Sequence, residues 1–138
     1  MQGYNIIIIF NKDLDKILMC ERKKDPYQGL NNFVGGKIEK GEHCQTAAYR
    51  ELYEETSITR HDVTLVHLMD FTYYLDDIFV EVWVGNLTKY IEVKDEINHL
   101  FWSDLDHNFF DLNIYAGEGN IGHMLEHVKM SKDKIFKK

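Results

Sequence analysis

The stretch of sequence that decides the fold is GKIEKGEHCQTAAYRELYEETSI, residues 36–58. Its composition predicts a helix from Cys44 to Thr56, because apolar and acidic residues fall on different faces at a period near 3.6. Glu51, Glu54 and Glu55 are spaced i, i+3 and i+4, which places three carboxylates close together on one helical face. Like charges at this spacing destabilise a helix unless a counter-charge is present.

Two interpretations of this acidic face remain open at this point. Three glutamates alone are ordinarily a solvated charged face, and Arg50 is the only cation in the same two turns. Carboxylate oxygens are also the ligands that Mg²⁺ or Mn²⁺ prefers. The glycine-rich segment before the helix (Gly35, Gly36, Gly41) allows the backbone to approach phosphates or a metal closely.

The spacing of the whole stretch resembles the Nudix box, G-x5-E-x7-R-E-U-x-E-E-x-G-U, in which U is apolar. Every charged position of that pattern is present, and the matching residues are Gly36, Glu42, Arg50-Glu51-Leu52, Glu54-Glu55 and Ile58. The flanking Asn31–Gly35 and Lys37–Glu39 also resemble the entry to the box in MutT-type members that clean the nucleotide pool. Ser57 departs from the pattern, because glycine is usual there. We expect Ser57 to occupy a left-handed position after the helix, where serine costs about 1 kcal/mol or less.

The resemblance implies a role for each matching residue. Glu51, Glu54 and Glu55 would hold divalent ions, Mg²⁺ with Mn²⁺ as an alternative, and the carbonyl of Gly35 or Gly36 would complete the coordination. Arg50 would brace the glutamates, whereas its alternative role is an ordinary surface ion pair. Glu42 would support the loop or join an outer metal shell. The family often recruits one more carboxylate from a distant loop as ligand or base, and Glu96 of Asp95-Glu96 is preferred over a solvated acid.

The substrate-binding candidates come from outside the helix. Lys37 and Arg22 are candidate phosphate contacts, and Asn32 matches an asparagine that similar enzymes place beside a purine. Glu118 is a candidate for hydrogen bonds to the base edge, or a helix-capping residue, and Asn120 is a natural N-cap for a helix that begins at Ile121. Three aromatic residues either stack on a base or belong to the core: Phe33, Tyr73 and Trp83.

The rest of the chain predicts a β-rich protein with a second helix. β-branched and aromatic runs bounded by turn residues predict strands over 4–10, 17–21, 63–75, 78–87 and 97–102, with a short stretch at 30–34. The apolar stripe of residues 121–129 predicts a helix. Together with the resemblance, these elements predict an α/β fold, a Nudix-type α/β/α sandwich with a mixed β-sheet and the Nudix loop-helix, as one domain over residues 1–138.

Composition excludes several classes of function. The formal net charge of −7 argues against a nucleic acid polymer or an anionic membrane as partner. The apolar run of residues 6–10 is too short for a signal peptide or a transmembrane helix. Cys20 and Cys44 are expected to be reduced thiols, so we expect a cytoplasmic protein. The sequence does not indicate the oligomeric state.

The resemblance implies a Nudix pyrophosphohydrolase acting on a nucleoside diphosphate derivative. We expect hydrolysis of a nucleoside triphosphate, with oxidised purine nucleotides as candidates, to a monophosphate and pyrophosphate. The alternatives are ADP-ribose, a dinucleoside polyphosphate or an RNA 5′ end as substrate, or a non-catalytic domain that binds a nucleotide and regulates a partner. His123-Met124-Leu125-Glu126-His127 also fits the H-x-x-E-H pattern of a zinc peptidase, but no third ligand is evident.

Overall fold

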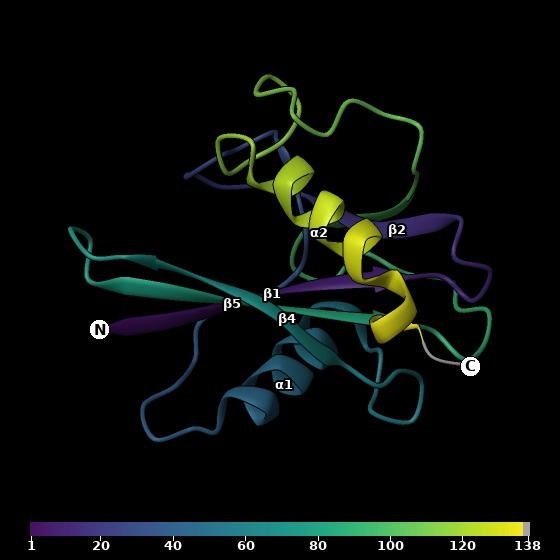
Figure 1. Cartoon of the computed structure of the whole chain (residues 1–138), viewed down its shortest axis with the longest axis horizontal. Coiled ribbons are helices and arrows are strands. Elements are labelled where there is room, and N and C mark those ends of the chain that lie inside the picture. Colours follow the sequence, from purple (N-terminus) through teal and green to yellow (C-terminus); the bar gives the residue numbers. More distant parts are fainter. Residues whose placement is uncertain (137–138) are drawn as a thin grey trace.

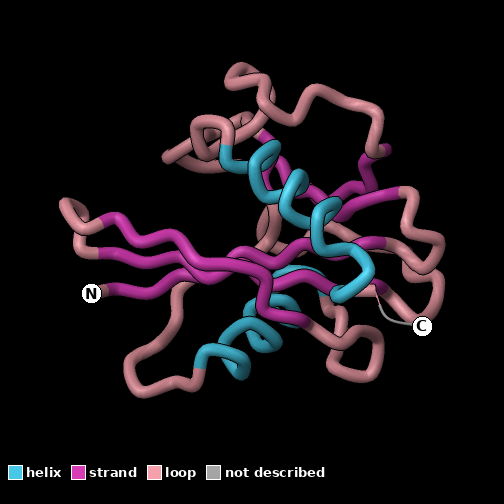
Figure 2. Tube along the Cα trace, in the orientation of Figure 1, coloured by secondary structure: helices cyan, strands magenta, loops and turns pink. Residues whose placement is uncertain are grey.

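The computed structural model describes residues 1–136. Along these residues the elements are β1 (Gln2–Phe10), β2 (Lys16–Glu21), β3 (Asn31–Asn32), α1 (Cys44–Thr56), β4 (Val66–Tyr73), β5 (Ile78–Asn86), β6 (His99–Asp104) and α2 (Asn120–Ile135). The strands form one sheet (Figure 2). Its order is β3-β2-β1-β5-β4, and β6 pairs with β2 outside this order. β1 and β5 are parallel and the remaining strand pairs are antiparallel, so the sheet is mixed as predicted.

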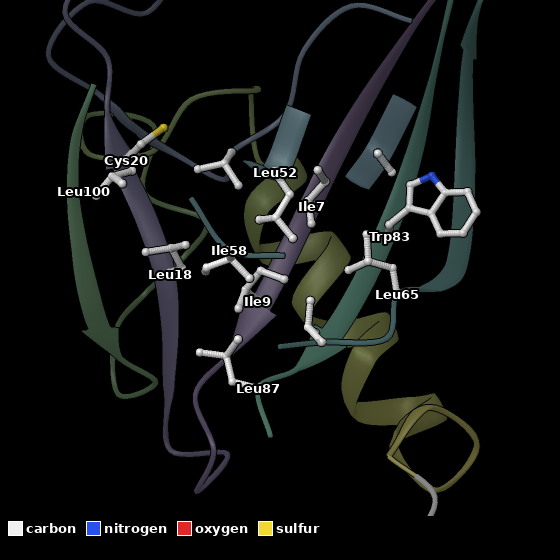
Figure 3. Packing of buried hydrophobic residues seen from close by; sticks show 13 residues of the cluster. Ile7, Ile9, Leu18, Cys20, Leu52, Ile58, Leu65, Trp83, Leu87 and Leu100 are labelled. Atoms are coloured by element: carbon white, nitrogen blue, oxygen red, sulfur yellow. The ribbon is translucent and has the colours of Figure 1, made fainter. Parts of the chain in front are cut away.

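Alternate residues of β1 face opposite sides of the sheet, and each side is covered by one helix (Figure 1). Ile7 and Ile9 pack in a core cluster with Leu52 of α1 (Figure 3). Ile8 packs in the opposite cluster with Met124 of α2. These layers, with solved relatives described below, confirm the predicted α/β/α sandwich.

The sheet opens between β1 and β2, and this opening positions the glycine-rich loop. β1 and β2 pair only near Phe10 and Ile17, so β2 does not pair with the first half of β1. The segment from Val34 onward occupies that edge of β1: the Ile7 amide donates to the Val34 carbonyl at 2.9 Å, and the Asn5 amide donates to the Gly36 carbonyl at 2.8 Å. The loop is therefore tied to the centre of the sheet.

Several element boundaries differ from those predicted. The helix over Cys44–Thr56 is as expected, but the strand predicted over residues 63–75 begins at Val66, because Val63 and Leu65 are buried in the core while outside a strand. The stretch at 30–34 contributes only two residues to the sheet. The strand predicted at 97–102 is shifted to 99–104, and Ile97 is exposed.

The last helix is longer than its apolar stripe suggested. It continues to Ile135, which packs with Phe136 against the core on that side. The prediction of Asn120 as its N-cap is wrong. The helix already includes Asn120, so Gly119 is the N-cap and no side chain caps the first turn. The Asn120 amide Nδ2 donates to the Tyr73 hydroxyl at 3.0 Å. No helix within residues 1–136 has the length and apolar content needed to cross a membrane.

Candidate active site

Helix α1 presents its acidic residues at the edge of the sheet because its opposite face is apolar. Ala47, Ala48 and Leu52 are fully buried against the sheet, which fixes the rotation of the helix. The His43 imidazole Nδ1 caps the first turn by accepting from the Gln45 amide at 3.3 Å.

The helix ends at Ser57, whose φ of 65° and ψ of 6° are left-handed. The expected conformation of this residue is therefore confirmed.

Arg50 joins the helix to the loop that precedes it. Its guanidinium donates to both carboxylate oxygens of Glu42, at 2.7 and 2.9 Å, and to the carbonyl of Lys37 at 3.0 Å. It also donates to Glu51 at 3.0 Å and to Glu54 at 3.1 Å. The hydrogen bond from Arg50 lowers the pKa of Glu42 to about 2. One side chain thus fixes three carboxylates relative to one another.

Glu55 lies on the side of the helix that faces the glycines. Its Oε2 accepts from the Gly35 amide at 3.2 Å, and no lysine or arginine within residues 1–136 forms an ion pair with it. Burial raises the pKa of Glu55 to about 7, and the nearby Glu51 carboxylate contributes to the rise. This carboxylate is therefore poorly compensated by the protein itself.

The two glycines allow the loop to approach both the sheet and the glutamates. Gly35 has a φ of 149°, and a Cβ there would overlap the Asn5 carbonyl oxygen. A Cβ at Gly36 would overlap the Glu51 carboxylate. Asn5 holds this arrangement from the sheet side, because its Oδ1 accepts from the Gly36 amide at 2.9 Å. Asn5 was not identified from the sequence, because a polar residue within the first strand gives no signal of what it contacts.

Gly35 and Gly36, which contact Glu55 and Glu51, line a cavity of about 590 Å³. It lies between β1, the loop at residues 22–36, the end of β4 and the loop before α2. Three of the four predicted substrate-binding residues line it, namely Arg22, Asn32 and Glu118. Lys37 does not line it; the side chain is exposed, and the residue contributes its carbonyl to Arg50. Lys37 therefore contacts the site through its backbone carbonyl and not through its side-chain ammonium.

A scan of family models matches residues 2–121 to the NUDIX domain. The chain belongs to the NUDIX family. The prediction of a Nudix pyrophosphohydrolase is thereby confirmed at the level of the family.

Relatives of this NUDIX chain carry several names. It is 32% identical over 111 residues to an ADP-ribose pyrophosphatase of Methanocaldococcus jannaschii, covering 72% of this chain and 64% of that protein. It is 38% identical over 66 residues to an RNA pyrophosphohydrolase of Haemophilus ducreyi, covering 46% of this chain and 32% of that protein. The chain thus spans less than two thirds of the length of either relative.

Solved structures share the fold along nearly the whole NUDIX chain. A structure from a study of MutT from Aliivibrio salmonicida and Vibrio cholerae has a TM-score of 0.71 at 24% identity, covering 94% of this chain and 98% of that one. A Caenorhabditis elegans Ap4A hydrolase complex has a TM-score of 0.76 at 20% identity, covering 98% and 100%. At these identities the likeness shows the fold alone.

The donor set of the NUDIX helix fits a divalent cation. Members of the family generally use a divalent metal. Glu51, Glu54 and Glu55 offer carboxylate oxygens beside the Gly35–Gly36 backbone, and hard cations prefer oxygen ligands. Within residues 1–136 Glu55 forms no ion pair with a lysine or arginine, and a bound cation would supply such a partner.

The structure places Glu96 beside the end of this helix. Its Oε1 accepts from the Ser57 hydroxyl at 3.3 Å, so the residue that departs from the Nudix pattern contacts the loop that carries the fourth acid. The neighbouring Asp95 has a structural role: its Oδ1 accepts from the Leu100 amide at 2.9 Å. Glu96 is thus the member of the pair that lies next to the glutamate helix.

Tyr27 adds to the predicted set, and the structure places the three aromatic residues that the sequence singled out. The Tyr27 hydroxyl lies 2.9 and 2.8 Å from the carboxylate oxygens of Glu118, and burial with this hydrogen bond raises the pKa of Tyr27 to about 12. Tyr73 lines the cavity and contacts Asn120. Phe33 also lines the cavity but is buried in the core, and Trp83 is a core residue that does not line it. Tyr27 was missed because its partner is 91 residues away.

The zinc-peptidase alternative has no third ligand. The rings of His123 and His127 lie 4.6 Å apart on α2, but within residues 1–136 they belong to no group of three metal-donor side chains with mutually close ligand atoms.

Proposed function

We propose that this protein is a Mg²⁺-dependent pyrophosphohydrolase that cleaves a nucleoside triphosphate to the monophosphate and pyrophosphate, with purine nucleotides preferred. One observation carries the proposal: Glu51, which Arg50 braces, and Glu55 lie against Gly35–Gly36, and these glycines line a cavity of about 590 Å³ together with Asn32 and Glu118. A nucleotide with its phosphates at the glutamates would extend its base into this cavity. We further propose that residues 1–138 form one domain and that the protein is cytoplasmic.

The roles of the protein groups follow from their positions. Glu51, Glu54 and Glu55 would hold the metal with the Gly35 carbonyl, and Arg50 keeps Glu51 and Glu54 in register. Mg²⁺ supplies charge neutralisation of the bridging phosphates and an activated water when it is bound.

A carboxylate accepts the proton of the attacking water, and Glu96 is the candidate that Ser57 positions. Arg22 would meet the phosphates from the cavity wall. The catalytic contribution of the chain is positioning and electrostatics.

Asn32 is the proposed contact to the base. Its Oδ1 accepts from the Phe33 amide at 2.8 Å, which fixes the side chain at the cavity wall and leaves its amide group to face a ligand. An amide offers both donors and an acceptor, which suits a purine edge. Glu118, held by Tyr27, is the second candidate and also lines the cavity.

ADP-ribose is the second candidate substrate, because the relative that matches 72% of this chain bears the name ADP-ribose pyrophosphatase. The match covers 64% of that protein, so about a third of its length has no counterpart in the alignment with this chain. The RNA pyrophosphohydrolase match is shorter, at 46% of the chain, and the net charge of −7 does not favour a polynucleotide.

A panel of substrates with Mg²⁺ tests the proposal. Purine and pyrimidine triphosphates, 8-oxo-dGTP, ADP-ribose and a dinucleoside polyphosphate are each incubated with the enzyme, and products are separated by chromatography. We expect a monophosphate with pyrophosphate, and a higher kcat/KM for purine triphosphates. Faster cleavage of ADP-ribose, to AMP and ribose 5-phosphate, would overturn the substrate proposal while leaving the pyrophosphohydrolase proposal intact. No cleavage of any of them would overturn both.

A further inference from the structure

A second group of metal-donor side chains lies on β4 and β5, outside the Nudix helix. His67, Asp70 and Glu81 each offer one ligand atom, and these atoms all lie within 4.8 Å of one another. His67 and Asp70 are exposed, and Glu81 is half-buried. None of the three belongs to the Nudix pattern or lines the cavity described above.

A β-bulge brings His67 and Asp70 to the same face of the sheet. Residues three apart in a regular strand point to opposite faces. Here the register shifts between His67 and Met69, so that His67 pairs with Trp83 and Asp70 pairs with Glu81. The extra residue is Leu68, and bulges of this kind re-aim side chains. The irregularity in β4 therefore creates the cluster.

Trp83 fixes two of the three donors. The His67 ring stacks on the Trp83 indole with centroids 4.8 Å apart and planes inclined by 16°. The indole Nε1 donates to Glu81 Oε1 at 3.2 Å. Trp83 itself is 7% exposed and packs at the edge of the core cluster on the α1 side (Figure 3). A rigid core residue thus orients both an imidazole and a carboxylate, as supporting residues do around metal ligands.

The charge of the cluster is not balanced by a lysine or an arginine. Asp70 and Glu81 are direct partners across two antiparallel strands, an arrangement in which like charges destabilise a sheet. Among residues 1–136, the only ion pair made by either carboxylate is that of Asp70 with His67, at 2.6 Å. A divalent cation between the three donors would remove the repulsion.

We propose that His67, Asp70 and Glu81 form a binding site for a transition-metal ion of the Zn²⁺ type, which ties β4 to β5. One imidazole and two carboxylates are a ligand set for Zn²⁺, with water in the fourth position. Donors on a tetrahedral Zn²⁺ with bonds of about 2.0 Å lie roughly 3.3 Å apart. The three observed donor atoms lie within 4.8 Å of one another, so each separation exceeds this distance by about 1.5 Å at most. An imidazole ligand selects against Mg²⁺, so this site and the glutamate site would hold different ions.

Calorimetric titration with Zn²⁺, in the presence of excess Mg²⁺ to occupy the glutamates, tests the proposal. The wild-type protein is expected to bind one Zn²⁺ that Mg²⁺ does not displace. His67→Ala and Glu81→Gln should each weaken this binding by at least about 10-fold. His99→Ala is the matched control, because His99 also pairs with an aspartate, Asp95, at 3.0 Å, but belongs to no three-ligand group within residues 1–136. It should leave the affinity unchanged.

Circular dichroism establishes that each variant is folded, and Glu81→Gln retains an oxygen that can accept from Trp83. If His67→Ala does not fold, Glu81→Gln decides the question. Equal Zn²⁺ affinity in Glu81→Gln and the wild type, or no Mg²⁺-resistant binding by the wild type, would overturn the proposal. With Co²⁺ in place of Zn²⁺, we expect the intense visible absorption of tetrahedral coordination, and a weak octahedral spectrum alone would contradict the site. Neither readout depends on nucleotide hydrolysis.

Discussion

Arg50 offers a test that separates charge from geometry. Its guanidinium makes five hydrogen bonds, two of them to Glu42 and one each to Glu51, Glu54 and the Lys37 carbonyl. Arg50→Lys keeps the positive charge but replaces a planar fork by a point charge that cannot reach all these acceptors. Arg50→Met removes the charge as well and leaves the half-buried carboxylates unpaired.

A charge-assisted hydrogen bond contributes about 1.5–3 kcal/mol when it is protected from solvent, and less when exposed. The side chains of Glu42 and Glu51 are only 14% and 12% exposed, whereas Glu54 is 50% exposed and contributes little. We therefore expect Arg50→Lys to lower the unfolding free energy by about 1–2 kcal/mol and Arg50→Met by about 2–4 kcal/mol. Because the bracing of the glutamates that are proposed to bind the metal is lost, kcat/KM should fall about 10- to 100-fold in Arg50→Lys.

Urea denaturation measures the unfolding free energy, and pyrophosphate release from a nucleoside triphosphate measures kcat/KM. Comparison of the two variants shows whether the fork matters beyond its charge. If Arg50→Lys retained the wild-type values of both quantities, the assignment of Arg50 as the brace of the glutamates would be refuted.

The remaining variants test the helix end, a buried carboxylate and the base contact. Ser57→Gly should raise the unfolding free energy by a few tenths to about 1 kcal/mol, since the φ of Ser57 is 65°. A urea midpoint below that of the wild type would contradict this prediction. Asp62→Asn should lower the unfolding free energy by about 1–2 kcal/mol at pH 7, because the buried Asp62 carboxylate accepts from the Thr59 amide. That hydrogen bond, the largest cause, holds the pKa of Asp62 below 3.8, so the stabilisation is present above that pH and is lost as the pH falls through the folded-state value. The urea midpoints of Asp62→Asn and the wild type should therefore converge as the pH falls. A difference that stays constant with pH would contradict this prediction. Asn32→Ala should narrow the preference for purine over pyrimidine triphosphates by about 10- to 100-fold without abolishing hydrolysis; an unchanged ratio of kcat/KM values would remove Asn32 from base recognition.

The helix and the conformation at its end could be predicted from the sequence because they depend on local spacing. The i, i+3, i+4 pattern placed Glu51, Glu54 and Glu55 together, and the bounds of the helix agree with those predicted. The left-handed conformation of Ser57 followed from its position after the last turn. These features need only the geometry of one helix and its ends.

The other parts of the site depend on contacts between distant segments. Asn5 reaches Gly36 only because β1 and β2 diverge, and Tyr27 meets Glu118 only in the folded chain. Asparagine is a common N-cap residue, but Asn120 lies within the helix and its side chain donates to the Tyr73 hydroxyl. Tertiary hydrogen bonds override local preferences at such positions, and a single sequence does not report them.

Replacement of the metal-binding glutamates tests the central claim most directly. The measurement is kcat for a nucleoside triphosphate in Glu54→Gln and Glu55→Gln, with Glu126→Gln, an exposed glutamate on α2, as the matched control. We predict that each of the first two lowers kcat by at least about 100-fold with an unchanged circular dichroism spectrum, because each removes a charged metal ligand. Glu126→Gln should turn over at the wild-type rate. Near-wild-type turnover in both Glu54→Gln and Glu55→Gln would contradict the assignment of this helix as the catalytic metal site.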